Sequence, residues 1–165
     1  MGLAGLAFAA ALACAPATFA QSIALVGPDG QTATLNAADL AALPHLAVTV
    51  KQHDKTRTYE GALLGPIIAK VGAASGKAIH GAELATVIRI SAADGYQVVL
   101  GLAETDPGTR SGRIILADRA DGAALTKDGP FRLVVEDDLR PARSAMQVVK
   151  IEVLRLSIST PKPHH

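Results

Sequence analysis

Two arginines in a polar loop are the residues of this chain best suited to binding chemistry. Arg140 and Arg143 lie in the segment DDLRPARS, between two stretches typical of strands, and Ser144 directly after them is a further candidate contact. Loops of this kind often carry binding residues, and a guanidinium group can stack on a flat ring or grip phosphate oxygens. The alternative is a solvated connector whose charges pair with one another at the surface.

Carboxylates and a tyrosine supply the other candidate ligand groups. Glu104 and Asp106 follow the segment LGL and are expected on the rim of a pocket, although acids at this position could simply complement the start of a helix. Asp94 and Tyr96 flank Gly95 between two expected strands. A tight turn with positive φ at Gly95 would explain that pair without any ligand.

Motifs for catalysis and for metal binding are missing from the sequence. It has no Gly-x-Ser-x-Gly elbow, no phosphate-binding glycine-rich loop with a lysine, and no histidine pair at ligand spacing. The 16 basic and 15 acidic residues leave a net charge of +1, which indicates neither a nucleic-acid surface nor a polybasic membrane patch. The composition therefore favours a binding protein over an enzyme with visible catalytic residues.

Four segments, taken together, resemble a known family. They are YEG followed by a leucine pair at residues 59–64, DGY at 94–96, GPFRLV at 129–134 and the arginine-containing stretch at 143–151. In order and spacing they resemble the molybdopterin-binding domain of the sulfite oxidase family, in its small stand-alone form found outside the cytoplasm. The resemblance covers most of residues 21–160 and implies a pterin ligand.

Two departures from that family limit what the resemblance implies. The family holds molybdenum through a cysteine thiolate, and the only cysteine here is Cys14, in a segment expected to be removed. A tryptophan that often follows the arginine of the closing segment is replaced by Ser144. The resemblance thus implies a pocket for a pterin, but not the molybdenum chemistry of the family. The expected ligand is a pterin, which can be in a reduced form, and molybdopterin is the alternative cofactor.

The chemistry of a pterin indicates which side chains would hold it. Its 2-amino-4-oxo edge offers donors beside an acceptor, which a carboxylate can grip with two parallel hydrogen bonds. Its flat ring needs a stacking face, and beyond residue 20 only Tyr59, Tyr96 and Phe131 are aromatic. Arginines are therefore the leading candidates for stacking and for binding a phosphate or a hydroxylated side arm.

The pattern of apolar residues predicts an α+β domain, a mostly β mixed-sheet or barrel-like structure with a few short helices, rather than a doubly wound parallel sheet. Asn36 is a candidate N-cap, and Phe131 on an alternating strand is expected in the core. Helices are predicted over residues 37–43 and 61–74, and strands over 22–26, 32–35, 46–50, 56–60, 85–91, 96–100, 114–117, 131–135 and 148–158.

The first twenty residues form an uncharged apolar segment that ends in Thr18-Phe19-Ala20, as a secretory signal peptide does. An uncleaved membrane anchor and a lipoprotein site at Cys14 are the alternatives. Cleavage would leave residues 21–160 as a single pterin-binding domain and 161–165 as a flexible tail. We therefore expect a periplasmic protein that does not insert directly into the membrane.

Two classes of function follow. The first is a non-catalytic periplasmic protein that captures a pterin. It would pass the pterin to a partner, such as the periplasmic domain of a membrane signalling protein, or be recognised by that partner in its ligand-bound conformation. The second is a molybdopterin-dependent oxidoreductase or an accessory subunit of one. A structural relic without activity is the third reading.

Overall fold

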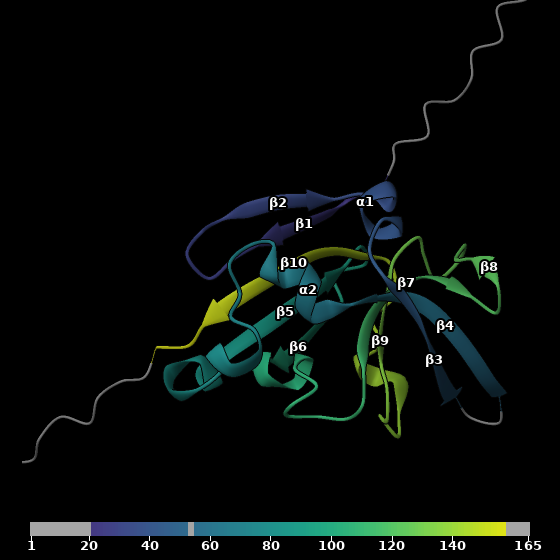
Figure 1. Ribbon diagram of the computed structural model, residues 1–165. Coiled ribbons are helices and arrows are strands. Elements are labelled where there is room, and N and C mark those ends of the chain that lie inside the picture. Colours follow the sequence, from purple (N-terminus) through teal and green to yellow (C-terminus); the bar gives the residue numbers. More distant parts are fainter. Residues whose placement is uncertain (1–20, 53–54, 158–165) are drawn as a thin grey trace, which may run out of the picture.

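Two five-stranded sheets build this protein in the computed structural model, which describes residues 21–52 and 55–157 (Figure 1). The first sheet has the order β2-β1-β10-β5-β6, and only its β1–β10 pair is parallel. Its strands are β1 (Ile23–Val26), β2 (Thr32–Leu35), β5 (Thr86–Ala92), β6 (Gln97–Gly101) and β10 (Val148–Arg155).

The second sheet is antiparallel throughout and has the order β3-β4-β7-β8, with β9 also pairing with β7. Its strands are β3 (His45–Gln52), β4 (Lys55–Leu63), β7 (Ile114–Ala120), β8 (Ala123–Ala124) and β9 (Arg132–Val135). The α+β, mostly β class is confirmed, but the described strands form two open sheets rather than a barrel.

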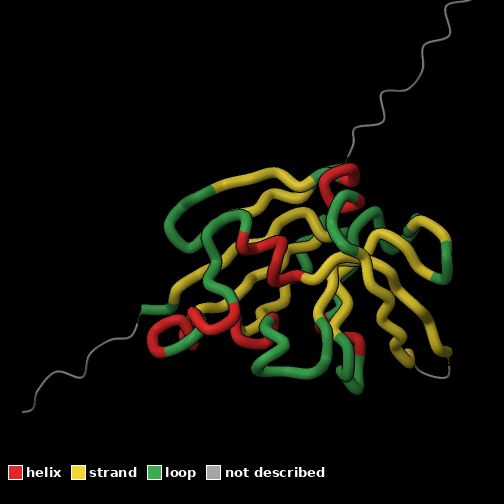
Figure 2. The backbone as a smooth tube through the Cα atoms, viewed as in Figure 1, coloured by secondary structure: helices red, strands yellow, loops and turns green. Residues whose placement is uncertain are grey.

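Helical structure is sparse and short, as Figure 2 shows. The α-helices are α1 (Ala37–Ala41) and α2 (Leu64–Ala69), and the 3₁₀ turns are η1 (Gly76–Ala78), η2 (Gly81–Ala85), η3 (Leu102–Thr105) and η4 (Pro141–Arg143). Asn36 caps α1 as predicted, because its side-chain oxygen accepts from the Asp39 N–H at 3.0 Å and the Asp39 carboxylate accepts from the Asn36 N–H.

The helix predicted over residues 61–74 is wrong at both ends. Its first three residues extend β4 and pair with β7, where Gly61 lies against the backbone of Leu116. The α-helix covers only Leu64–Ala69, and the chain reverses at Gly72, whose φ is +85°. Apolar residues at helical spacing thus continue through a strand end and a turn.

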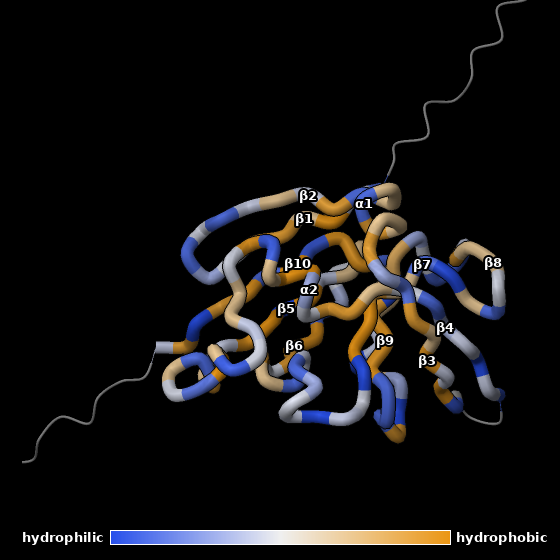
Figure 3. Tube along the Cα trace, viewed as in Figure 1, coloured by the Kyte–Doolittle hydropathy of each residue, from blue (hydrophilic) through white to orange (hydrophobic). Residues whose placement is uncertain are grey.

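A main apolar core joins both sheets and α2, with Ile90, Leu116, Leu133 and Ile68 among its buried members. A smaller cluster, which includes Val48, covers the other face of the second sheet. In Figure 3, β1 and β9 are largely apolar, whereas the loop that follows β9 is largely polar. The prediction that Phe131 is a core residue is confirmed, since it is fully buried.

Several sequence predictions concern residues outside the described ranges. The signal peptide (1–20), the tail (161–165) and the central residues of the turn after β3 (53–54) belong there. Within the described part of the chain, no helix has the length and apolar character needed to cross a membrane.

Candidate functional site

A cavity of about 320 Å³ opens where the β5–β6 hairpin, the start of β9 and the segment around η4 meet. Its volume lies near the lower end of the range found for small-molecule pockets, roughly 300–1,000 Å³. The lining residues come from three separate stretches of the chain: Ala92, Asp94, Tyr96, Arg132, Pro141, Ala142, Ser144, Ala145 and Met146. We call this space the hairpin cavity.

Tyr96 provides the aromatic side chain of the hairpin cavity. Its hydroxyl donates to the carbonyl oxygen of Ala142 at 2.6 Å, which ties the β5–β6 hairpin to η4. About half of the residue is exposed, so a flat ligand can reach the ring. The turn itself follows the prediction, because Gly95 has a φ of +86° and the Asp94 carboxylate accepts from the Tyr96 N–H at 2.9 Å. That bond engages one Asp94 oxygen and leaves the other for a ligand.

Arg132 also lines the hairpin cavity, although it is not among the site residues predicted from the sequence. Its side chain is only 7% exposed, and its Nε atom has no hydrogen-bond partner among the described residues. One terminal nitrogen donates to Asp128 at 2.7 Å, while the guanidinium lies 5.0 Å from the centroid of the buried Tyr59 ring. A buried guanidinium N–H without a partner is costly, so a ligand acceptor at this position would stabilise it.

Ser144 adds a hydroxyl to the same cavity and is nearly buried. Its Oγ atom accepts from the Val135 N–H at 3.4 Å. The Ser144 hydroxyl has no acceptor of its own in the described residues, so it can donate to a ligand.

Arg143 lies beside the hairpin cavity but is not part of its lining. Its guanidinium donates to both oxygens of Asp138, at 2.9 and 2.7 Å, and to Glu104 at 2.9 Å. These bonds join η4 to η3 and raise the pKa of Arg143 well above its ordinary value, chiefly through the bonds to Asp138 and Glu104. Arg143 is therefore placed to hold the loop that lines the cavity.

Glu104 serves two structural roles at once. Its carboxylate accepts from the Gly101 N–H at 2.9 Å, as an acid in the first turn of a helix can, and it also binds Arg143 and Arg110. Partial burial acts to raise the pKa of Glu104, but the Gly101 N–H, the Arg143 guanidinium and the charge of Arg110 outweigh it and lower the pKa.

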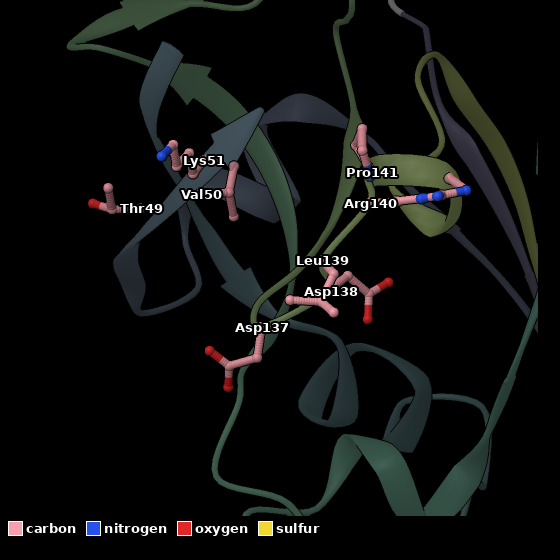
Figure 4. A pocket seen from close by; sticks show the side chains of 9 residues that line it. Thr49, Val50, Lys51, Asp137, Asp138, Leu139, Arg140 and Pro141 are labelled. Atoms are coloured by element: carbon pink, nitrogen blue, oxygen red, sulfur yellow. The ribbon is translucent and has the colours of Figure 1, made fainter. Parts of the chain in front are cut away.

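Arg140 is among the lining residues of a different and larger cavity, of about 900 Å³, between β3 and the loop of residues 137–142. Figure 4 shows this cavity, with Asp137, Asp138 and Leu139 along the loop and Lys51 on the opposite strand. The Arg140 side chain extends away from the β3 residues in that view. Positive and negative groups are mixed here, and Leu139 is almost fully exposed.

The structure thus brings together half of the six predicted site residues. Asp94, Tyr96 and Ser144 line the hairpin cavity, Glu104 and Arg143 form an ion pair next to it, and Arg140 belongs to the larger cavity. Asp106 lies on a third cavity together with Glu104. Arg132 lies in the GPFRLV segment, and an arginine in an otherwise apolar strand is the sequence signal that could identify it.

The residues that line the hairpin cavity combine several kinds of polar and aromatic side chain. An aspartate, a tyrosine, a serine and an arginine line one small cavity. The described residues contain no cluster of three or more histidine, cysteine, aspartate or glutamate side chains that could hold a metal ion. The arrangement can bind a flat polar heterocycle through its edge and its face.

Comparison with solved structures supports the fold expected from the sequence. The sulfane dehydrogenase SoxCD from Paracoccus pantotrophus matches with a TM-score of 0.63 and 16% sequence identity, over 84% of this chain and 39% of that one. This likeness shows the fold. It agrees with the mostly β, α+β fold of the chain, which spans well under half the length of that protein.

Searches by sequence add nothing to this structural likeness, since no protein-family profile and no curated protein matches the chain.

Proposed function

We propose that this protein is a non-catalytic pterin-binding protein of the periplasm. It either passes a pterin to a partner or is itself recognised by the partner in its ligand-bound conformation. The lining of the hairpin cavity carries this proposal, because Asp94, Tyr96 and Ser144 meet there with Arg132, whose buried Nε atom has no partner among the described residues. A pterin offers ring nitrogens and a carbonyl oxygen as acceptors for that donor, and an amino edge for the carboxylate.

The proposed partner is the periplasmic domain of a membrane signalling protein. The bond between Tyr96 and Ala142 supports a relay, because it connects the cavity to the loop that carries the almost fully exposed Leu139. A ligand that changes the position of the Tyr96 ring would act on this loop directly.

Binding of neopterin and of its dihydro form to the purified protein tests the proposal. We expect a dissociation constant in the micromolar range or below, about 8 kcal/mol or more. At a ligand concentration 100-fold above that constant, binding should stabilise the native state by about 2.7 kcal/mol and raise Tm by several degrees. Protein whose Tm is unchanged by excess oxidised and reduced pterins would contradict the proposal.

A second function, a molybdopterin-dependent oxidoreductase or an accessory subunit of one, is favoured by one observation. The matched SoxCD structure is that of a dehydrogenase. This reading predicts molybdenum at close to one atom per chain in protein produced in a host that makes the cofactor. Metal analysis and mass spectrometry of the small molecules released on denaturation separate the two functions, because a pterin without molybdenum supports only the first.

A further inference from the structure

Strand β3 forms one edge of the second sheet and is the longest edge strand in the described part of the chain. It has eight residues, pairs only with β4 among the described residues, and keeps one register with β4 from His45 to Gln52. By comparison, β2 has four residues, β6 has five and β8 has two. The outer side of β3 therefore presents a regular row of backbone N–H and C=O groups that can pair with a further strand.

The space beside this edge is open. Thr49, Val50 and Lys51 are separated from the loop of residues 137–142 by the cavity of about 900 Å³ that Figure 4 shows. Proteins often protect an exposed edge with prolines, bulges or charged side chains, and Lys51 is the one lysine or arginine of β3. Within the described residues, only Lys150 among the lysines forms an ion pair, so the charge of Lys51 is available to a partner.

An antiparallel pair of identical strands allows few alignments. Residues opposite one another must both direct their backbone groups toward the partner or both away from it, so the two-fold axis passes through a residue. With the axis at Thr49, Val48 lies opposite Val50 of the second copy, and Ala47 lies opposite Lys51 of the second copy. Val48 and Val50 lie on the side of the smaller apolar cluster, whereas the other three residues lie on the opposite face.

The charges of the two copies are complementary in this alignment. Glu60 on β4 is the direct neighbour of Ala47, and its ion pair with Arg119 is a long one, at 3.8 Å. Lys51 of the second copy would lie on the other side of Ala47, about two strand spacings or 9–10 Å from the Glu60 backbone. Alanine is short, so the lysine side chain can reach the carboxylate across it. The two-fold symmetry repeats this contact.

We infer that a second copy of this chain pairs antiparallel with the β3 edge, with the two-fold axis at Thr49, so that the second sheets of both copies join into one continuous sheet. An interface limited to strand edges is smaller than the roughly 1,600 Å² of a standard stable complex, so the dimer should be weak and reversible, with a Kd of about 10–100 μM. This inference does not depend on the pterin, and either proposal can fail without the other.

Charge reversal at the two ends of the predicted contact tests the inference. Sedimentation velocity of the purified protein gives the dimer Kd, and circular dichroism checks the fold of each variant. We expect Lys51→Glu and Glu60→Lys each to weaken dimerisation at least about tenfold, because like charges then face each other twice. An equimolar mixture of the two variants should dimerise about as strongly as the wild type, since each contact of the mixed dimer again joins a lysine and a glutamate.

Lys77→Glu is the matched control, because it reverses an exposed lysine of η1, outside the second sheet, and should leave the dimer Kd unchanged. A protein that remains monomeric up to about 200 μM would overturn the inference, as it lies above the expected Kd range. So would a dimer that the folded Lys51→Glu and Glu60→Lys variants form as tightly as the wild type.

Disulfide cross-linking tests the alignment. In a Cys14→Ser background, Thr49→Cys places two thiols opposite each other at the two-fold axis, where Cα atoms of paired strands are close enough for a disulfide. Oxidised glutathione should convert this variant into a covalent dimer. Ala47→Cys should stay monomeric on a non-reducing gel, because its thiols lie four residues out of register. Cross-linking of Ala47→Cys but not of Thr49→Cys would overturn the proposed alignment.

Discussion

The ring of Tyr96 is held at its hydroxyl end by the carbonyl oxygen of Ala142, so its orientation is set before any ligand arrives. Stacking of a flat heterocycle on an aromatic side chain is worth about 1–3 kcal/mol in nucleic-acid complexes. A pterin is comparable to a nucleobase in size and in its polar edge. Tyr96 is therefore the side chain whose removal should affect pterin binding most directly.

Tyr96→Ala should weaken neopterin binding by about 10- to 100-fold, because the stacking face is lost. Tyr96→Phe should have a smaller effect, since the ring remains and only its bond to Ala142 is removed. Isothermal titration calorimetry measures both. Val99→Ala, at an exposed position of the same hairpin, is the control. Unchanged affinity in Tyr96→Ala would exclude stacking at this residue.

Two substitutions of Arg132 should separate its structural role from its role in binding. Arg132→Met removes one partner of a largely buried ion pair and should lower the free energy of unfolding by about 3 kcal/mol. Arg132→Lys keeps a positive charge near Asp128 but lacks the Nε–H group.

We expect the lysine variant to be more stable than the methionine variant and still to lose most of its affinity for neopterin. Urea denaturation and fluorescence titration provide the two readouts. A lysine variant with wild-type affinity would show that the Nε atom does not bind the ligand. Arg119→Gln, at an exposed and long ion pair, should change neither property.

Sequence alone could identify part of the site because some of its residues lie in local patterns. Asp94 and Tyr96 flank a glycine between two strands, a pattern that fixes a turn. The burial of Arg132 could not be predicted in the same way, since it depends on the Tyr59 ring from another strand and on Asp128. The pairing of Arg143 with Glu104 likewise requires the contact between η3 and η4.

The ends of strands and helices could likewise be predicted from the sequence only where the residues that fix them are close together in the chain. The Asp94-Gly95 turn and the N-cap Asn36 were predictable because their chemistry lies within a few residues. The extension of β4 into residues 61–63 was not, because those residues are apolar at helical spacing. Their strand conformation comes from pairing with β7, which follows about fifty residues later in the chain.

Gly61→Ala should destabilise the protein strongly. A Cβ atom at this position would collide with the Leu116 carbonyl oxygen and would lie 2.5 Å from the Ala117 Cα atom, both in the backbone of β7. We expect the free energy of unfolding to fall by about 3 kcal/mol, because the strands must separate. Gly30→Ala provides the comparison: its Cβ would enter open space, and only the positive φ should cost about 1–2 kcal/mol. Equal losses in the two variants would contradict this account.

Carboxylates whose pKa values are lowered by bound arginines are found in several parts of the molecule. The Arg113 guanidinium lowers the pKa of Glu136, while Lys150 and Arg89 lower that of Glu152. The pKa of Glu104 is lowered by Gly101 and Arg143 against the effect of its burial. A carboxyl group whose pKa is lower in the folded state stabilises that state only while it is ionised.

Stability should accordingly fall in acid. Above the unfolded pKa of about 4.3, the contribution of these groups is fully present, and it is lost as the pH falls through their lower folded values. Urea denaturation between pH 7 and pH 3 should show a decline that begins near pH 4.5. Glu104→Gln should be less stable at pH 7 and should decline less steeply. Equal slopes for the two proteins would show that Glu104 does not contribute to this dependence.

The position of β10 has a consequence for the order in which the molecule can assemble. This strand is the last in the described sequence, yet it lies in the middle of the first sheet, between β1 and β5. Until residues 148–155 have been synthesised, the β1–β2 and β5–β6 hairpins have no strand to join them. The first sheet is therefore completed only after β10 has been synthesised, and loss of this strand would leave two separate hairpins.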